Sequence, residues 1–147
     1  MFIKLTSEPY LSTYSVEILS SPHKNGGPWV ITMENVINET EAEQLIELGS
    51  IEGYKRSSDV GKLNADGTFQ SEVNGGRTST NAWCQNTCYK NETALTVAYR
   101  LSNLTGISER NSEYLQLLKY ESGQFYQVHH DYIEYEVRTT SVVPIKL

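Results

Sequence analysis

The sequence is poor in the residues that several classes of protein require. It has three histidines and two cysteines among 147 residues. No stretch approaches the roughly 20 apolar residues of a membrane-spanning helix. Lysine and arginine number 12 against 18 aspartates and glutamates, which leaves a net charge of −6. That balance argues against a protein that binds nucleic acid or an anionic membrane, because both need a basic surface. The first residues hold no unbroken apolar segment, so we identify no standard signal peptide.

The length is enough for one domain with a real hydrophobic core. The two cysteines, Cys84 and Cys88, leave two interpretations open. They are either buried or free thiols, or a short-loop disulfide formed in an oxidising compartment. They do not predict a zinc site, because no third ligand lies near them in the sequence.

The order of the predicted elements indicates an α+β protein. Residues 1–28 are rich in proline and turn residues, and we expect a loosely ordered N-terminal segment there. Two helices are predicted, one from an Asn38 cap to Gly49 and one over 91–104 that stops at Gly106. The second carries an apolar stripe, which is predicted to be core. Extended segments are predicted at 29–36, 53–60, 77–83, 113–120 and 125–131.

Three connecting segments complete the predicted arrangement. Residues 61–76 are rich in glycine, asparagine and aspartate, so we read them as a long surface loop. The turn Glu121–Gln124 predicts that 113–131 forms a hairpin. After Asp131 the sequence begins again in strand-like alternation, with Ile133, Tyr135 and Val137 on one side.

The run His129-His130-Asp131 is the most informative motif of the sequence. In a strand, residues two apart point to the same face, so His129 and Asp131 would aim a nitrogen and an oxygen at one point while His130 faces away. His-x-Asp is two thirds of the facial triad that holds non-haem Fe(II). Taken alone, the same motif also fits a polar surface strand.

The surroundings of that motif resemble the prolyl 4-hydroxylase family of Fe(II)- and 2-oxoglutarate-dependent dioxygenases. The similar segments are WVITMENVINETEAEQLIELG, RTSTNAW, RLSNLTGI and NSEYLQLLKYESGQFYQVHHDYI, in that order. The resemblance covers roughly residues 29–133. It implies N-terminal helices packed on a double-stranded β-helix (jelly-roll) core, of which only the first part is present, within a partial dioxygenase domain over 29–147. It implies Fe(II), 2-oxoglutarate and ascorbate as cofactors and a proline-containing peptide or protein as substrate.

The resemblance also assigns roles to single residues. His129 and Asp131 match the first two iron ligands, and Tyr120 matches the tyrosine whose hydroxyl binds the carboxylate of 2-oxoglutarate. Four further residues match the peptide groove, where Tyr126 would present an aromatic face to proline rings; they are Arg77, Ser79, Glu113 and Tyr126. The 61–76 segment matches a mobile lid over the substrate. The family implies the endoplasmic reticulum or secretory pathway as the compartment.

The sequence departs from the family after Asp131. The family's second half brings a distal histidine and a basic residue that pairs with the far carboxylate of 2-oxoglutarate. No histidine follows Asp131, His23 lies in the N-terminal segment, and Lys146 comes too early to match. We therefore expect a fragment of a prolyl 4-hydroxylase-type protein with little or no turnover.

Two other interpretations stay open at this stage. The chain could be a catalytically dead module or subunit that binds proline-rich peptides without iron. It could also be an unrelated, metal-free β domain, because the fold of a protein does not fix its function.

Overall fold

The structure, a computed structural model, describes residues 1–131 of the chain. It mixes helices with small antiparallel sheets, and within those residues no sheet closes into a barrel. The predicted α+β class is confirmed at this level. The helices are α1 (Phe2–Leu5), α2 (Tyr10–Thr13), α3 (Pro22–Asn25), α4 (Glu39–Glu52), α5 (Glu92–Thr105) and the 3-10 turns η1 (Cys88–Lys90) and η2 (Glu109–Asn111). The strands are β1 (Glu17–Ser20), β2 (Val30–Thr32), β3 (Lys55–Arg56), β4 (Asp59–Leu63), β5 (Phe69–Glu72), β6 (Thr80–Trp83) and β7 (Gln116–Lys119).

Helix α4 begins where the sequence predicts and ends later. The Asn38 side chain accepts a hydrogen bond from the Glu41 N–H at 2.8 Å, and the Glu41 carboxylate accepts one from the Asn38 N–H at 3.0 Å. This reciprocal cap satisfies two N–H groups that the first turn leaves unpaired. The predicted stop at Gly49 is wrong, because the helix runs to Glu52 and ends at Gly53, which has φ +87°. Gly49 serves close packing instead: a Cβ there would lie 2.3 Å from the Tyr54 hydroxyl oxygen.

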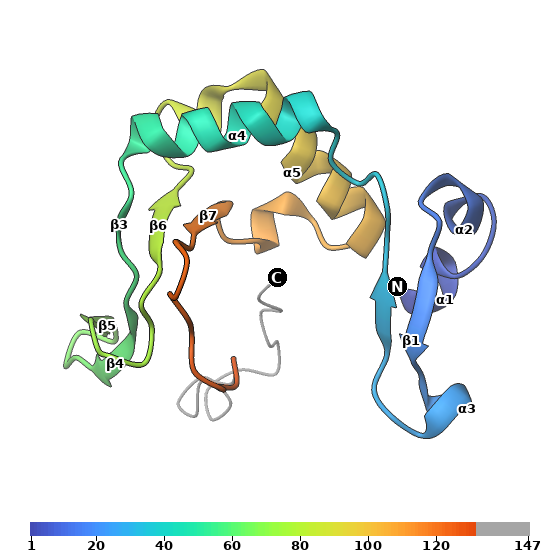
Figure 1. The fold of residues 1–147 in the computed structure, drawn as a ribbon, viewed down its shortest axis with the longest axis horizontal. Coiled ribbons are helices and arrows are strands. Elements are labelled where there is room, and N and C mark those ends of the chain that lie inside the picture. Colours follow the sequence, from blue (N-terminus) through green and yellow to red (C-terminus); the bar gives the residue numbers. More distant parts are fainter. Residues whose placement is uncertain (132–147) are drawn as a thin grey trace.

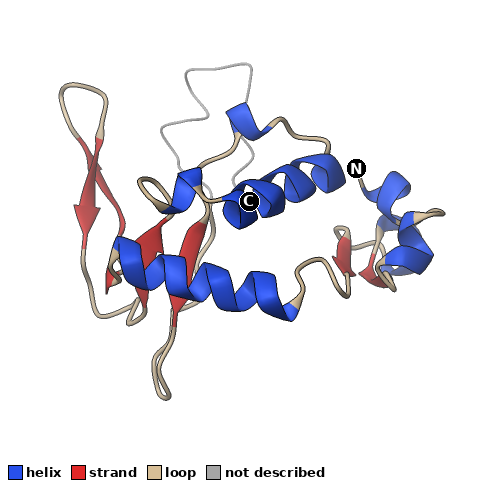
Figure 2. Ribbon diagram, turned by 90° about the horizontal axis from the view of Figure 1, so that it is seen from above, coloured by secondary structure: helices blue, strands red, loops and turns tan. Residues whose placement is uncertain are grey.

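Helix α5 matches its prediction within one residue and ends at Gly106, whose φ is +73°. Its apolar stripe is core, as predicted, with Ala94, Val97 and Leu104 buried. Arg100 joins its outer side to the start of α4, because both guanidinium Nη atoms lie 2.7 Å from the Glu41 carboxylate oxygens. Figure 2 shows α4 and α5 as the two long helices of the molecule.

The buried core, which we call the helix cluster, lies between these helices and the sheet. It consists of Leu45, Leu48, Cys84, Cys88, Ala94 and Val97, and Leu115 and Leu117 pack against it. Cys84 and Cys88 form a disulfide, which settles the choice that the sequence left open. The Glu52 carboxylate accepts hydrogen bonds from the Cys88 N–H at 2.8 Å and the Asn86 amide at 2.9 Å. The loop that the disulfide closes is therefore also held from the end of α4.

The central sheet has the order β3-β6-β7, with all neighbours antiparallel. The hairpin predicted over 113–131 does not form. Strand β7 pairs with β6 instead, and residues 125–131 contribute one isolated bridge, between Tyr126 and Arg77. The turn at Glu121–Gln124 exists, but it does not reverse the chain. After the turn the chain continues in the direction of β7 and pairs again with the segment just before β6. The reason is that the 77–83 segment offers a long extended partner that a local turn signal does not reveal.

The 61–76 segment, predicted as a long surface loop, contains most of a β-hairpin. Strands β4 and β5 pair antiparallel around a turn at Asn64–Gly67, where Gly67 has φ +84°. Asp66 closes the turn by accepting hydrogen bonds from the N–H and hydroxyl of Thr68, at 2.9 and 2.6 Å. The Asp-Gly pair in this segment is itself a hairpin signal, which the polar composition obscured. In Figure 1 the hairpin lies at the end of the sheet opposite α4.

Residues 1–28 hold more regular structure than the prediction of a loose segment implies. They contain three one-turn helices and β1, which pairs antiparallel with β2. The boundary predicted at residue 28 therefore falls between two paired strands. The rings of Phe2 and Trp29 stack with centroids 5.5 Å apart, and Lys4 donates to the Asn103 carbonyl at 2.7 Å. Figure 1 shows this N-terminal part on the far side of the molecule from the β4–β5 hairpin.

No helix within residues 1–131 is both long and apolar enough to span a bilayer. The strand-like alternation predicted at Ile133, Tyr135 and Val137 and the position of Lys146 lie outside the described residues.

Candidate functional site

A groove of about 1000 Å³ lies between the β4–β5 hairpin, strand β7 and the 126–131 segment. Gln116 and Leu118 are the residues of β7 that line it. Five residues that the sequence singled out line this one groove: Arg77, Glu113, Tyr126, His129 and Asp131. They come from three separate parts of the chain. The structure therefore brings together most of the predicted site.

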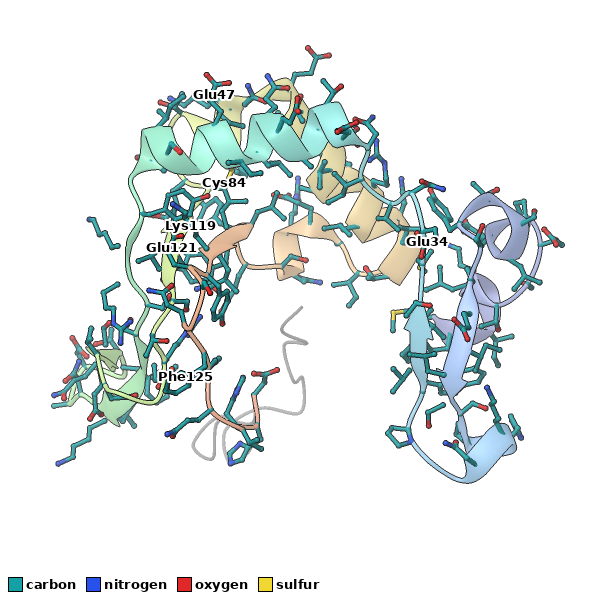
Figure 3. The ribbon with its side chains drawn as sticks, viewed as in Figure 1. Glu34, Glu47, Cys84, Lys119, Glu121 and Phe125 are labelled. Carbon is teal, nitrogen blue, oxygen red and sulfur yellow. A yellow bond between two sulfur atoms is a disulfide. The ribbon has the colours of Figure 1, made fainter. Side chains whose placement is uncertain are left out.

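Strand pairing explains how these segments meet. Thr80 lies opposite Lys119, and further along Arg77 lies opposite Tyr126. Between those two pairs the 77–80 segment advances three residues, whereas the 119–126 segment advances seven. The extra residues form the Glu121–Gln124 turn, which bulges away from the partner segment. Thr78 and Phe125 exchange backbone and hydroxyl hydrogen bonds across the gap. Figure 3 shows Lys119, Glu121 and Phe125 following one another along this run toward the β4–β5 hairpin.

His129 and Asp131 face each other although they do not sit in a strand. The His129 Nε2 lies 3.7 Å from the Asp131 Oδ1. The Nδ1 of His129 lies 2.7 Å from the Gln127 carbonyl oxygen. Because a carbonyl only accepts, Nδ1 carries the proton and the neutral ring leaves a lone pair on Nε2, toward Asp131. A backbone carbonyl that orients a histidine in this way is a common support for a metal ligand.

The predicted strand over 125–131 does not form, so the alternation that set His130 apart from His129 and Asp131 does not apply. All three residues line the groove. Within residues 1–131, no group of three histidine, cysteine, aspartate or glutamate side chains gathers as metal ligands would. His129 and Asp131 present one imidazole nitrogen and one carboxylate oxygen, which are two of the three donors that a facial-triad iron site uses.

Tyr126 is packed on its ring faces and bonded at its hydroxyl. Its ring stacks on the His129 imidazole with centroids 3.6 Å apart. The Arg77 guanidinium carbon lies over the same ring, 4.6 Å from its centre. The hydroxyl donates to Asp59 Oδ1 at 2.8 Å. We call Arg77, Tyr126 and His129 the Tyr126 stack.

This packing differs from the role that the resemblance gives Tyr126. With a histidine and an arginine on its ring, the tyrosine has no free face to offer a proline ring in this arrangement. Burial, together with the hydrogen bond to Asp59 and the negative charge of Asp59, raises the pKa of the Tyr126 phenol. The phenol therefore stays a proton donor across the physiological range.

Asp59 is a charged groove residue that the sequence did not single out. Its Oδ2 accepts from the Asn74 amide at 2.7 Å, and its Oδ1 lies 3.6 Å from Arg77 Nη1 in addition to its bond with Tyr126. Partial burial acts to raise the pKa of this carboxyl, but the hydrogen bonds from Asn74 and Tyr126 and the charge of Arg77 outweigh it and hold the pKa below its ordinary value. The only signal for Asp59 in the sequence is its place at the start of an unrecognised hairpin.

Ser79 and Tyr120 lie away from the groove. Ser79 is fully buried, and its hydroxyl bonds the hydroxyl of Ser57 at 3.0 Å. The structure therefore does not place Ser79 in the groove, where the resemblance expects it. Its side chain instead connects the chain just before β6 to Ser57, just after β3. Tyr120 is 45% exposed and does not line the groove. Its two chain neighbours, Lys119 and Glu121, form an exposed ion pair at 2.8 Å.

A smaller, more apolar pocket of about 310 Å³ lies beside the groove, between α5 and β7. The two cavities share Trp83, Glu113, Gln116 and Leu118 in their walls. Tyr89 and Tyr114 meet edge to face in the wall of the smaller one, with centroids 4.9 Å apart.

No protein-family model and no curated protein sequence matches this chain. The case for a function therefore rests on the geometry of the groove and on the motifs of the sequence.

Proposed function

We propose that this chain carries the peptide groove and two iron ligands of a prolyl 4-hydroxylase-type dioxygenase site. The observation that carries the proposal is the His129–Asp131 pair, whose Nε2 and Oδ1 face each other at 3.7 Å inside a groove. In this proposal the β3-β6-β7 sheet is the first part of a double-stranded β-helix core, and the helices pack on it from one side.

The chain's own residues would divide the work as follows. His129 and Asp131 hold Fe(II), with the Gln127 carbonyl keeping the imidazole in the tautomer that leaves Nε2 free to bind. Iron with 2-oxoglutarate and O₂ supplies the oxidising chemistry that hydroxylates carbon 4 of a peptidyl proline, and ascorbate keeps the iron reduced. Tyr120, to which the resemblance assigns a carboxylate of 2-oxoglutarate, does not line the groove, so the proposal gives its hydroxyl no contact there.

The groove also supports a peptide as the substrate class. Its wall contains Trp83, Leu118 and Val128, all of which are substantially exposed and offer apolar contact to proline rings. Within the described residues, the Arg77 Nε is a buried donor without a hydrogen-bond partner. Glu113 lines the same groove and adds negative charge to it.

The disulfide supports an oxidising compartment for this function. Cys84 and Cys88 are joined and buried in the helix cluster. Disulfides of this structural kind persist in the endoplasmic reticulum and the secretory pathway and are rare in reducing compartments. We therefore place the chain in the secretory pathway as part of the proposal.

A second candidate is favoured by one specific observation. Within residues 1–131 two protein donors converge and not three, whereas the groove that would hold a peptide is formed from several segments. A module that binds proline-rich peptides without metal is consistent with that combination.

The first experiment separates the two candidates by adding metal to the chain. A proline-rich peptide is titrated into the 147-residue chain by calorimetry, with Co²⁺ and then with a chelator, and Co²⁺ alone is titrated in parallel. The iron-site proposal expects Co²⁺ binding that His129→Ala abolishes and that the control His23→Ala leaves unchanged. Peptide binding that survives chelation, with no Co²⁺ binding, supports the metal-free module.

Turnover is the second measurement. Succinate is followed in the presence of Fe(II), 2-oxoglutarate, ascorbate and the same peptide. We expect low turnover that Asp131→Ala removes, because only two of the three iron ligands are found within residues 1–131. No Co²⁺ binding, no peptide binding and no succinate would together contradict both candidates.

A further inference from the structure

Asp59 lies at the centre of the polar contacts that hold one wall of the groove. It is the first residue of β4, at the base of the β4–β5 hairpin. One of its oxygens accepts from Asn74, on the chain just beyond the hairpin, and the other accepts from Tyr126 at 2.8 Å and faces Arg77 at 3.6 Å. A single carboxylate thus connects both ends of the hairpin with the segment that carries His129.

Tyr126 passes this contact on to His129. Its ring and the imidazole have centroids 3.6 Å apart with an interplanar angle of 23°. At that separation the imidazole covers one face of the phenol ring, so a guanidinium that also lies over the ring, at 4.6 Å, has room only on the other face. The phenol ring is held between two cationic or polar groups, and its hydroxyl is fixed by Asp59.

Arg77 is fixed by the same part of the chain. Its Nη1 donates to the Ser58 carbonyl at 3.0 Å, beside the Asp59 carboxylate. Arg77 and Tyr126 are also the bridged pair of the two backbone segments. Both outer layers of the stack are therefore anchored: Arg77 by Ser58 and Asp59, and His129 by the Gln127 carbonyl.

We propose that Asp59 is a positioning residue of the candidate site, which holds the Tyr126 stack together and so directs the His129 imidazole toward Asp131. This inference deepens the proposed function and rests on it for the role of His129. It also changes the role of Tyr126, which becomes a support for His129 in place of a surface for proline rings.

The geometry can be tested without metal or peptide. In the NMR spectrum of the 147-residue chain, an aromatic ring stacked on His129 moves the C–H signals of that imidazole upfield relative to those of His23. Asp59→Ala removes the acceptor for Tyr126 and is expected to abolish this upfield displacement. Asp59→Asn keeps an oxygen that can accept from the hydroxyl, so most of the displacement should return.

The matched control is Asp66→Ala, which removes a hydrogen-bonded carboxylate from the tip of the same hairpin. It is expected to leave the His129 signals in place, and so to show that contact with Tyr126 matters and not the hairpin in general. Should Asp59→Ala fail to fold in a thermal-unfolding measurement, Tyr126→Phe tests the same bond by removing only the hydroxyl. That variant should reduce the displacement.

Measuring Co²⁺ affinity then tests whether the Tyr126 stack affects the His129–Asp131 pair. Loss of a group that orients a metal ligand lowers affinity about 10- to 100-fold, and Asp59→Ala should fall in that range while Asp66→Ala does not. The inference is overturned if Asp59→Ala leaves the upfield displacement of the His129 signals unchanged. It is also overturned if that variant loses the displacement but keeps the Co²⁺ affinity of the unmodified chain. A chain that binds no Co²⁺ but shows the Asp59-dependent displacement contradicts the proposed function and supports Asp59 as the residue that positions His129.

Discussion

The two faces of strand β7 border regions of opposite character. Leu115, just before the strand, and Leu117 pack on the helix cluster, whereas Gln116 and Leu118 line the groove. The first side is built from apolar packing and a buried disulfide. The second side is organised by a carboxylate, a guanidinium, a phenol and an imidazole that contact one another in a fixed order.

The difference teaches where stability and specificity reside in this chain. Apolar burial is non-directional and roughly additive with area, so the helix cluster should govern the free energy of unfolding. Hydrogen bonds and stacking are directional and contribute less net stability. Changes in the Tyr126 stack should therefore alter the geometry of the groove more than the stability of the whole chain.

The strongest test of this division is Leu48→Ala on the helix side. Leu48 is buried in the helix cluster, and truncating a buried leucine removes its contacts and leaves a cavity, at a cost of about 3 kcal/mol. Ile46→Ala, on the exposed side of the same helix, is the matched control and should cost far less. Chemical denaturation measures both. Equal losses for the two variants would contradict the assigned core.

The second prediction concerns the disulfide. Replacing both cysteines by alanine releases a short loop, for which the chain-entropy model gives about 2 kcal/mol. The loss should appear in chemical denaturation of the double variant. Treating the native chain with a reductant should produce a similar loss, while the same treatment leaves the double variant unchanged. A reductant effect on that variant would point to a cause other than Cys84 and Cys88.

The third prediction moves to the hairpin beside the groove. Gly67→Ala places a side chain at φ +84° and is expected to cost about 1 kcal/mol. Gly75→Ala is the control, since its Cβ meets no atom within 4 Å and its φ is not left-handed. Hydrogen exchange should show faster opening of the Asn64–Thr68 turn only. Loss of protection in α5 as well would mean that the groove side is not a separate region.

The smallest effect is a pH dependence on the helix side. Hydrogen bonds from Arg100 and from the Asn38 N–H lower the pKa of Glu41 from 4.5 to about 2. Because the folded-state pKa lies below the unfolded one, this contribution to stability is present above pH 4.5 and is lost as the pH falls toward 2. Glu41→Gln should weaken the dependence of the melting temperature on pH in that range. Glu39→Gln, in the same helical turn, is the control and should keep that dependence. Identical profiles for the two variants would contradict the role of the Arg100 pair.

The helix side was largely predictable from the sequence because its signals are local. The cap at Asn38, the stripe on α5 and the stop at Gly106 each depend on residues within a few positions of one another. The one error there, the stop at Gly49, came from reading a glycine as a helix end when it makes room for Tyr54.

The groove side was predicted only in part because its contacts span distant segments. The motifs identified Arg77, Tyr126, His129 and Asp131, and the structure brings them into one groove. Their mutual contacts depend on which extended segments pair, and that is decided by tertiary packing and not by a turn signal such as Glu121–Gln124. Asp59 was missed for the same reason, since nothing near it in the sequence indicates Tyr126, 67 positions away.

The bulged turn at Glu121–Gln124 has a practical consequence for engineering. Its first three residues are exposed, and the paired segments on either side are fixed by their own backbone bonds to 76–83. Exposed turns of this kind tolerate inserted sequence. A short tag or a fluorophore attachment site placed after Ser122 would therefore sit close to the candidate site while leaving both flanking registers intact.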